Sequence, residues 1–156
     1  MMKKMAKIGR LCNTIRLHSS SSIKVGSKVS EKRVFSREDV QKFCQIIGDT
    51  NPVHFDDGAA QRLNFSSIIV PGLQLNGTVA SIIGSKLPGP GSILVKQFLD
   101  FVNPCYIGEQ VETTVWISAL KKKFIECQYE CIVHSSAKVV MKGNALIYKP
   151  VIPEMK

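Results

Sequence analysis

The sequence lacks any uninterrupted apolar run close to the roughly 20 residues that a membrane-spanning helix needs, so we expect no membrane insertion. It also lacks a C-x-x-C pair among its five cysteines, and it holds a single tryptophan. Cys127, Cys131 and His134 have a spacing that resembles a metal site. However, the two cysteines lie in a segment that alternates in the pattern of one strand face, which favours buried free thiols over zinc ligands. We therefore expect neither a metal nor an organic cofactor.

Acidic residues are absent from the first 30 positions, which hold seven basic residues. Subtracting these seven from the 21 of the whole chain leaves 14 basic against 12 acidic residues over residues 31–156. The formal net charge of +9 therefore belongs mainly to the N-terminal segment, and the rest of the chain is nearly neutral. This distribution argues against a basic nucleic-acid-binding module, for which the sequence shows no recognition motif.

The basic N-terminal segment has the composition of a mitochondrial targeting sequence. Ile8, Leu11 and Ile15 would share one face of a helix, basic residues would lie on another face, and four serines follow at positions 19–22. Basic, amphipathic and acid-free segments of this kind direct proteins to mitochondria. We predict that residues 1–30 are a transit peptide or a disordered basic leader, that residues 31–156 form one domain, and that the protein is located in the mitochondrial matrix.

Helical signals dominate the first half of this domain. Ser36 can cap a helix whose apolar residues follow at helical spacing up to Gly48, a residue type that commonly ends helices. A short helix is expected over residues 58–63 and a longer one over residues 72–87. The longer helix combines apolar residues with many small ones, which is typical of a helix buried against a surface that wraps it.

The second half of the domain is predicted to form strands. Apolar or alternating segments predict strands over residues 93–102, 111–119, 124–134 and 137–148, with the three lysines at 121–123 as a solvated turn. We expect Gly143 to mark a β-bulge. The order of elements predicts an α+β domain in which helices lie on one face of an antiparallel sheet.

Asp49 and His54 lie five positions apart in the run Gly48-Asp49-Thr50-Asn51-Pro52-Val53-His54. Pro52 interrupts a helix and turns the chain, so both side chains could point into one pocket. A carboxylate and an imidazole in one pocket could hold a water molecule and move a proton in either direction. An Asp and a His near a Pro are more often ordinary turn residues, so this pair alone leaves both interpretations open.

The run is followed by Ile69-Val70-Pro71-Gly72, by Gly84-Ser85-Lys86-Leu87-Pro88-Gly89 and by Phe101-x-x-Pro104-x-x-x-Gly108-Glu109. In this order the motifs resemble those of the MaoC-like hot dog family over about residues 34–148. Within that family the chain looks most like the (R)-specific enoyl-thioester hydratases and the mitochondrial 3-hydroxyacyl-thioester dehydratases. The resemblance implies a single hot dog fold, with an antiparallel sheet wrapped around a central helix, and a homodimer joined edge to edge.

The resemblance also implies a role for individual residues. Asp49 and His54 match the family's catalytic pair, and Gly72 matches the glycine whose backbone N–H forms the oxyanion hole. Removing a proton next to a thioester places negative charge on the carbonyl oxygen, which a helix N-terminus can stabilise. Which of Asp49 and His54 takes the C2 proton stays open, although we favour His54. Asn51 is expected to hold the turn that orients the pair.

Two further sets of residues leave alternatives open. Related hydratases often carry a hydroxyl residue in the central helix that hydrogen-bonds the catalytic aspartate, and spacing places that position at Ala80. Either Ser81 or Thr78 substitutes as the supporting residue, or the support is absent. Lys86 and the lysines at 121–123 could contact the phosphates of a carrier, although for the three lysines at 121–123 a solvated turn is the commoner explanation.

The predicted function is the reversible dehydration of (R)-3-hydroxyacyl thioesters to trans-2-enoyl thioesters, in mitochondrial fatty acid synthesis. The expected partners are acyl thioesters of acyl carrier protein or coenzyme A and a second copy of the chain, with no nucleic acid. A hot dog acyl-thioesterase would share the fold, and a noncatalytic acyl-binding scaffold would not need both Asp49 and His54. Neither the carrier nor the preferred chain length can be deduced from these patterns.

Overall fold

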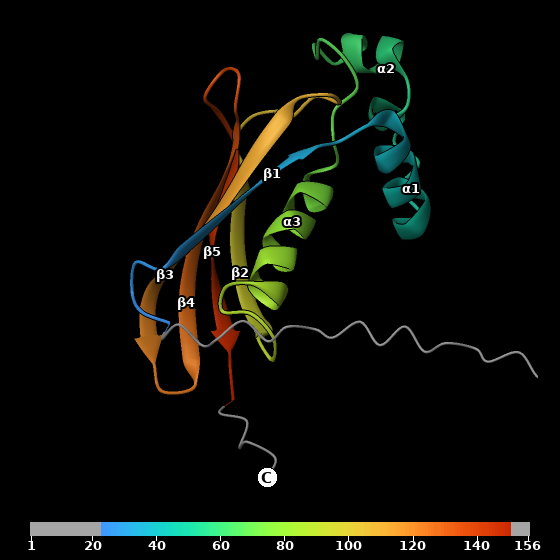
Figure 1. Ribbon diagram of the computed structural model, residues 1–156. Coiled ribbons are helices and arrows are strands. Elements are labelled where there is room, and N and C mark those ends of the chain that lie inside the picture. Colours follow the sequence, from blue (N-terminus) through green and yellow to red (C-terminus); the bar gives the residue numbers. More distant parts are fainter. Residues whose placement is uncertain (1–22, 151–156) are drawn as a thin grey trace, which may run out of the picture.

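The computed structural model describes residues 23–150. Figure 1 shows a sheet with α3 lying along one face, and α1 and α2 beyond the end of the sheet where α3 begins. This is the α+β architecture of a hot dog fold, as predicted. No helix within residues 23–150 has both the length and the apolar character needed to cross a membrane. In chain order the elements are β1 (Lys28–Val34), α1 (Arg37–Ile47), the 3-10 helix η1 (Pro52–His54), α2 (Asp57–Arg62), α3 (Gly72–Ser85), β2 (Ile93–Phe101), β3 (Gln110–Lys121), β4 (Phe124–Val133) and β5 (Lys138–Tyr148).

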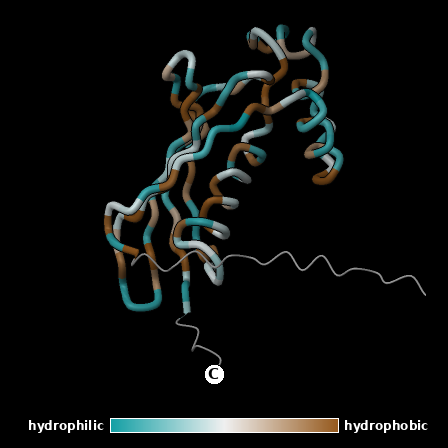
Figure 2. The backbone as a smooth tube through the Cα atoms, in the orientation of Figure 1, coloured by the Kyte–Doolittle hydropathy of each residue, from teal (hydrophilic) through white to brown (hydrophobic). Residues whose placement is uncertain are grey.

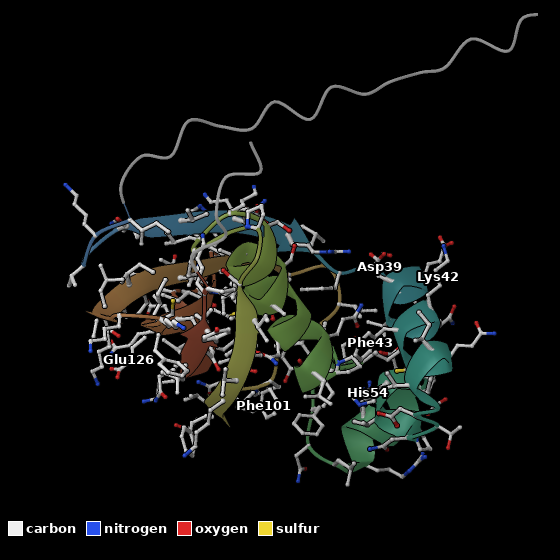
Figure 3. All side chains as sticks on the ribbon, turned by 90° about the horizontal axis from the view of Figure 1, so that it is seen from below. Asp39, Lys42, Phe43, His54, Phe101 and Glu126 are labelled. Carbon is white, nitrogen blue, oxygen red and sulfur yellow. The ribbon has the colours of Figure 1, made fainter. Side chains whose placement is uncertain are left out.

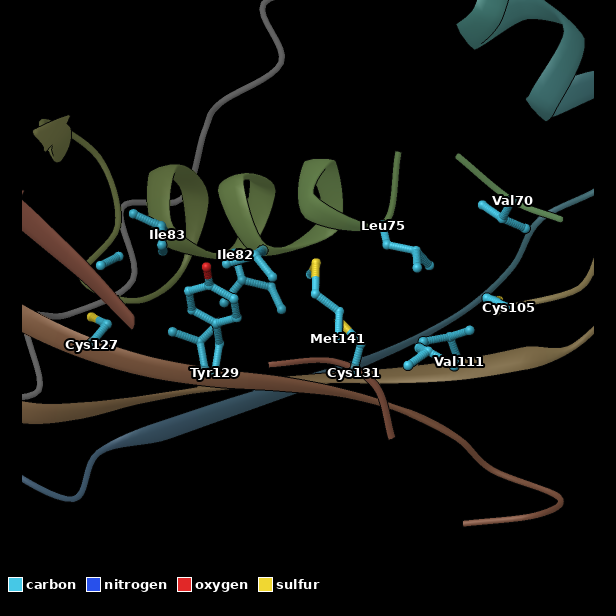
Figure 4. Packing of buried hydrophobic residues seen from close by; sticks show 14 of the residues in the cluster. Val70, Leu75, Ile82, Ile83, Cys105, Val111, Cys127, Tyr129, Cys131 and Met141 are labelled. Carbon is cyan, nitrogen blue, oxygen red and sulfur yellow. The ribbon is translucent and has the colours of Figure 1, made fainter. Parts of the chain in front are cut away.

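The central helix α3 packs on a five-stranded sheet whose strand order is β1-β3-β4-β5-β2, with every neighbouring pair antiparallel. Figure 4 shows Leu75, Ile82 and Ile83 of α3 facing Tyr129 and Met141 of the sheet. These five side chains are buried, and burying an apolar side chain of this size contributes about 1.5–3 kcal/mol. The packing fixes where α3 begins relative to the end of the sheet.

Helix α1 has the start and the end that its sequence predicts. The Ser36 side chain accepts a hydrogen bond from the backbone N–H of Asp39, and the Asp39 carboxylate accepts one from the backbone N–H of Ser36. This reciprocal capping satisfies two donors that the first turn leaves without intrahelical partners. At the other end Gly48 adopts the left-handed conformation, with φ of 73°. The chain therefore turns sharply just before Asp49.

The four strands predicted from the sequence are confirmed within a few residues at each end. In β4, Cys127, Tyr129 and Cys131 are buried and Gln128 is exposed, as the alternation predicts. Burial raises the pKa of Cys127 to about 12 and that of Cys131 to about 11, so both remain protonated thiols at neutral pH. In Figure 2 the sheet carries hydrophobic positions, whereas the turn between β3 and β4, with the three lysines, is hydrophilic.

Strand β1 was not expected, because residues 28–30 were assigned to the leader. The strand pairs with β3 from Lys28 opposite Trp116 to Val34 opposite Gln110. Its sequence KVSEKRV is mostly charged and polar, so it lacks the apolar alternation of a half-buried strand. An edge strand has only one neighbour, and charged side chains there discourage pairing with another chain. The folded domain therefore begins at or before Lys28.

The β-bulge expected at Gly143 is wrong. Residues around Gly143 pair in regular register with both β2 and β4, and the register shifts of the sheet occur elsewhere. A Cβ atom added at Gly143 would lie 2.2 Å from the carbonyl oxygen of Phe98 and 2.6 Å from the hydroxyl of Tyr129. Glycine is needed here because the neighbouring strand and the buried Tyr129 approach the backbone closely.

Candidate active site

A cavity of about 410 Å³ lies where the C-terminal end of α1, the loop after it, the start of α3 and the end of β2 meet. Asp49, His54 and Gly72 all line it. Figure 3 shows His54 beside α1 and Phe101 at the end of β2, with the start of α3 between them. The remaining lining residues are mostly apolar: Ile47, Phe65, Ile69, Val70, Pro71, Leu73, Leu75, Phe101, Val102, Asn103, Pro104 and Cys105.

Asp49 is held by the backbone on both sides. Its own N–H donates to the carbonyl oxygen of Cys44 at 2.9 Å, which continues the end of α1. Its Oδ1 atom accepts a hydrogen bond of 2.9 Å from the backbone N–H of Asn51. The side chain is 31% exposed, so the carboxylate reaches solvent through the cavity. The turn fixes one oxygen and leaves the other, Oδ2, directed toward His54.

His54 ends the short helix η1, whose first residue is Pro52. Proline suits this position because the first residue of a helix needs no N–H donor. The Asn51 side chain accepts a hydrogen bond from the N–H of Val53 at 3.4 Å and caps the helix. Asn51 therefore holds the turn through both its side chain and its backbone, and this turn carries His54 back toward Asp49.

The imidazole of His54 is 10% exposed and is oriented by a backbone carbonyl. Its Nδ1 atom lies 2.8 Å from the carbonyl oxygen of Ile69, and its Nε2 atom lies 3.6 Å from Oδ2 of Asp49. A carbonyl oxygen can only accept, so Nδ1 carries the hydrogen and Nε2 of the neutral ring presents a lone pair. One water molecule could donate one hydrogen to Nε2 and the other to Oδ2 across the 3.6 Å gap.

Gly72 is the first residue of α3, directly after Pro71. Its backbone N–H belongs to the first turn, where no intrahelical carbonyl is available and the helix dipole is positive. A Cβ atom at this position would lie 2.4 to 2.8 Å from ring atoms of Phe101. Glycine therefore allows α3 to start against the end of β2, where the residue lines the cavity.

Two side chains tie the loop that carries Asp49 and His54 to the rest of the fold. Gln74 of α3 donates from Nε2 to the carbonyl oxygen of Asp39 in α1 at 3.1 Å. Arg37 donates to the carbonyl oxygen of Phe55 and to the carboxylate of Asp57, both at 3.0 Å. These contacts hold α1 and the end of the loop in place on either side of the cavity.

The supporting hydroxyl expected from the central helix is not found near Asp49. Ser81 is exposed and does not line the cavity, and nine residues of helix place it about 13 Å from Gly72 along the axis. The hydroxyl of Thr78 donates to the carbonyl oxygen of Leu75 at 2.7 Å. In this chain the hydrogen bond that orients the Asp49 carboxylate comes from the backbone of Asn51 instead.

The sequence analysis missed three features of the cavity. The carbonyl of Ile69 and the thiol of Cys105 had no signal, because each depends on how distant segments meet. Phe101 was noticed only as part of a motif, and its contact with Gly72 emerges from the fold. Burial raises the pKa of Cys105 to about 12, so its thiol is a poor nucleophile at neutral pH.

The lysines considered for phosphate contact do not line the cavity. Lys86 forms an ion pair with Glu31, and Lys121 pairs with Glu126 at 2.5 Å. Within residues 23–150 no three His, Cys, Asp or Glu side chains are grouped as metal ligands. Among the side chains that line the cavity, Asp49 and His54 are the proton-transfer groups, and Asn103 adds an amide that donates to the carbonyl oxygen of Val139.

Comparison with known proteins agrees with this fold. Residues 19–139 match the family model described as MaoC like domain. An (R)-specific enoyl-CoA hydratase of Rhodospirillum rubrum is 36% identical over 136 residues, which cover 86% of this chain and 93% of the relative. A mitochondrial 3-hydroxyacyl-[acyl-carrier-protein] dehydratase of Arabidopsis thaliana is 32% identical, with 85% of this chain and 81% of the relative covered.

Among solved structures, the (R)-hydratase from Aeromonas caviae superposes with a TM-score of 0.79 at 28% sequence identity. The match covers 83% of this chain and 99% of that chain. These relatives are hydratases and dehydratases, so the chain falls in a class of hydro-lyases that share the hot dog fold. The chain belongs to the MaoC-like family.

Proposed function

We propose that the protein catalyses the reversible addition of water to trans-2-enoyl thioesters, giving (R)-3-hydroxyacyl thioesters. The observation that carries the proposal is the 3.6 Å approach of His54 Nε2 to Asp49 Oδ2 in a cavity that also exposes the start of α3. The reaction and its stereochemistry are inferred from two relatives, an (R)-specific enoyl-CoA hydratase and a 3-hydroxyacyl-[acyl-carrier-protein] dehydratase.

In the dehydration direction, the lone pair of His54 Nε2 takes the proton from C2. The electrons of that C–H bond form the C2–C3 double bond, and the C3 hydroxyl leaves as water with the proton of the carboxylic acid form of Asp49. The step leaves an imidazolium at His54 and a carboxylate at Asp49. Hydration is the reverse, with water placed between Asp49 and His54. Because the two groups lie only 3.6 Å apart, hydrogen and hydroxyl leave from the same face of the substrate, and the elimination is syn.

Gly72 serves the same step from the other side of the thioester. As the proton leaves C2, negative charge develops on the carbonyl oxygen of the thioester. The N–H of Gly72 at the positive end of α3 donates to that oxygen and stabilises the charge. Asn51 acts through Asp49 and is a positioning residue, since its backbone N–H fixes Oδ1.

Crotonyl-CoA separates this proposal from its nearest competitor. A hydratase removes the absorbance of the conjugated thioester without releasing free thiol, whereas a hot dog thioesterase releases coenzyme A. We expect the absorbance of the conjugated thioester to fall while no free thiol appears. If free thiol appeared as fast as the absorbance fell, the thioesterase would be favoured. Substrates on acyl carrier protein, assayed in parallel, identify the preferred carrier.

The free edge of β2 supports a homodimer. Apolar side chains along this strand are exposed, among them Val95 at 54% and Phe98 at 57%, whereas the opposite edge strand β1 is charged. Exposed apolar edge strands pair readily with another chain. Light scattering should give a dimer for the wild type and a monomer for Val95→Lys. The matched variant Val34→Lys, at an exposed valine of β1, should stay dimeric, and a monomeric wild type would exclude this arrangement.

A mitochondrial location is proposed from the acid-free leader and from the plant mitochondrial relatives, which are 32% and 31% identical. Because β1 begins at Lys28, we place the removable segment before that residue. A fluorescent reporter carrying residues 1–27 should accumulate in the mitochondrial matrix. A diffuse cytosolic signal from that fusion would contradict targeting by this segment.

A further inference from the structure

A closed pair of amides bridges α3 and β2 beside the candidate active site. Asn76 Nδ2 donates to Gln97 Oε1 at 3.0 Å, and Gln97 Nε2 donates to Asn76 Oδ1 at 2.7 Å. Gln97 Nε2 also lies 2.8 Å from the hydroxyl of Tyr129, which in turn donates to the carbonyl oxygen of Phe98. The amides satisfy each other and are anchored to a buried tyrosine, so their position is well defined.

The amide pair lies one helical turn beyond the cavity. Asn76 follows Gly72 by four residues and therefore lies on the same side of α3. Gln97 precedes Phe101 by four residues and therefore points to the same face of β2. Gly72 and Phe101 line the cavity and lie against each other. The amide pair therefore closes the seam, meaning the line of contact between α3 and β2, one helical turn further along α3.

Beyond the amide pair the seam is apolar and bordered by small residues. Ala80 and Gly84 continue the same side of α3, and both are exposed. A Cβ atom added at Gly77 or Gly84 would meet nothing within 4 Å. The residues beyond the amide pair thus offer room and apolar surface to a hydrocarbon chain, and the amides block the way to it.

We propose that the Asn76–Gln97 amide pair is the floor of the acyl site and restricts this enzyme to short-chain enoyl thioesters. The inference rests on the proposed hydratase function. With the thioester at Gly72, the acyl tail runs past Leu75 and Phe101 toward the amides. A longer tail would have to separate these half-buried amides and break both hydrogen bonds between them, which is unfavourable.

The test compares trans-2-enoyl-CoA substrates of increasing length on the wild type, Asn76→Ala and Asn144→Ala. Asn144 is a matched asparagine, exposed on the other face of the sheet. In the wild type, kcat/KM should fall by about tenfold or more from crotonyl-CoA to trans-2-octenoyl-CoA. Asn76→Ala should raise the octenoyl-to-crotonyl ratio of kcat/KM by about tenfold, and Asn144→Ala should leave that ratio unchanged.

The outcomes separate the two proposals. If the wild type hydrates octenoyl-CoA with the same kcat/KM as crotonyl-CoA, the amide pair is not the floor of the acyl site. The hydratase function would still hold, and this result requires no variant. An unchanged ratio in Asn76→Ala with a native melting curve also overturns the floor. If Asn76→Ala does not fold, Gln97→Ala is measured in its place against the same expectation. A wild type that hydrates neither substrate removes the hydratase function, and the floor with it.

Discussion

The Nδ1 atom of His54 lies 2.8 Å from the carbonyl oxygen of Ile69, fifteen residues further along the chain. This contact determines the tautomer of the ring, because a carbonyl can only accept. It leaves Nε2 as the basic atom that faces Asp49 in the cavity. The segment before α3 therefore both orients the imidazole and leads the chain into Gly72.

We predict that His54→Ala and Asp49→Asn each lower kcat for crotonyl-CoA hydration by about 10² to 10⁴-fold, because each removes one proton-transfer group. The melting temperature should change little, since His54 and Asp49 line a cavity. The matched control is His134→Ala, an exposed histidine after β4. If either His54→Ala or Asp49→Asn kept most of its activity, the assigned acid–base pair would be wrong.

Gly72→Ala should reduce both stability and activity. The added methyl would lie within 2.8 Å of the Phe101 ring, and such overpacking costs about 1–3 kcal/mol. Gly77→Ala in the same helix meets nothing within 4 Å and should stabilise by up to about 1 kcal/mol. Urea unfolding measures both. If the Phe101 ring causes the loss, adding Phe101→Ala to Gly72→Ala should cost less than the sum of the single changes.

Acid should weaken the contact network around Asp57. Hydrogen bonds from Ser67, then from Arg37 and the N–H of Ile68, hold the pKa of Asp57 below its ordinary value of 3.8. A carboxylate whose pKa is lower in the folded than in the unfolded state stabilises the protein at pH values above its unfolded-state pKa. This stabilisation is lost as the pH falls through its folded-state pKa. The free energy of unfolding of Asp57→Asn should therefore decline less than that of the wild type below pH 3.8.

Asp100→Asn, at an exposed carboxylate on β2, is the control for this comparison. Its acid dependence should follow that of the wild type. If the free energy of unfolding fell equally with pH in the wild type and in Asp57→Asn, the contacts of Asp57 would not contribute to acid sensitivity.

The thiol of Cys105 should be unreactive although it lines the cavity. Desolvation raises its pKa to about 12, so almost none is thiolate at neutral pH, and the residue is 2% exposed. Iodoacetamide should leave the peptide containing Cys105 unmodified in the folded protein and label it in urea, as peptide mass spectrometry can show. Rapid labelling of the folded protein would instead indicate an accessible thiolate.

Local signals in the sequence determined most of the secondary structure. Ser36 and Gly48 bound α1 because capping depends on residues within one turn of the helix end. The burial of Cys127, Tyr129 and Cys131 followed from alternation, because successive side chains of a strand point to opposite faces. The motifs around Asp49, His54 and Gly72 likewise predicted residues that the fold brings to one cavity, since each lies in a short contiguous run.

Contacts between distant segments were decided only by the tertiary structure. Strand β1 forms because β3 offers it a partner, although its own sequence lacks apolar alternation. Gly143 and Gly72 are glycines because of Tyr129, Phe98 and Phe101, which lie on other elements. The sequence left open whether Ser81, Thr78 or neither supports Asp49, and the fold places Ser81 on an exposed side of α3 away from the cavity. A sequence specifies local conformation directly, whereas hydrogen bonds and close approaches across the fold exist only once α3 has packed on the sheet.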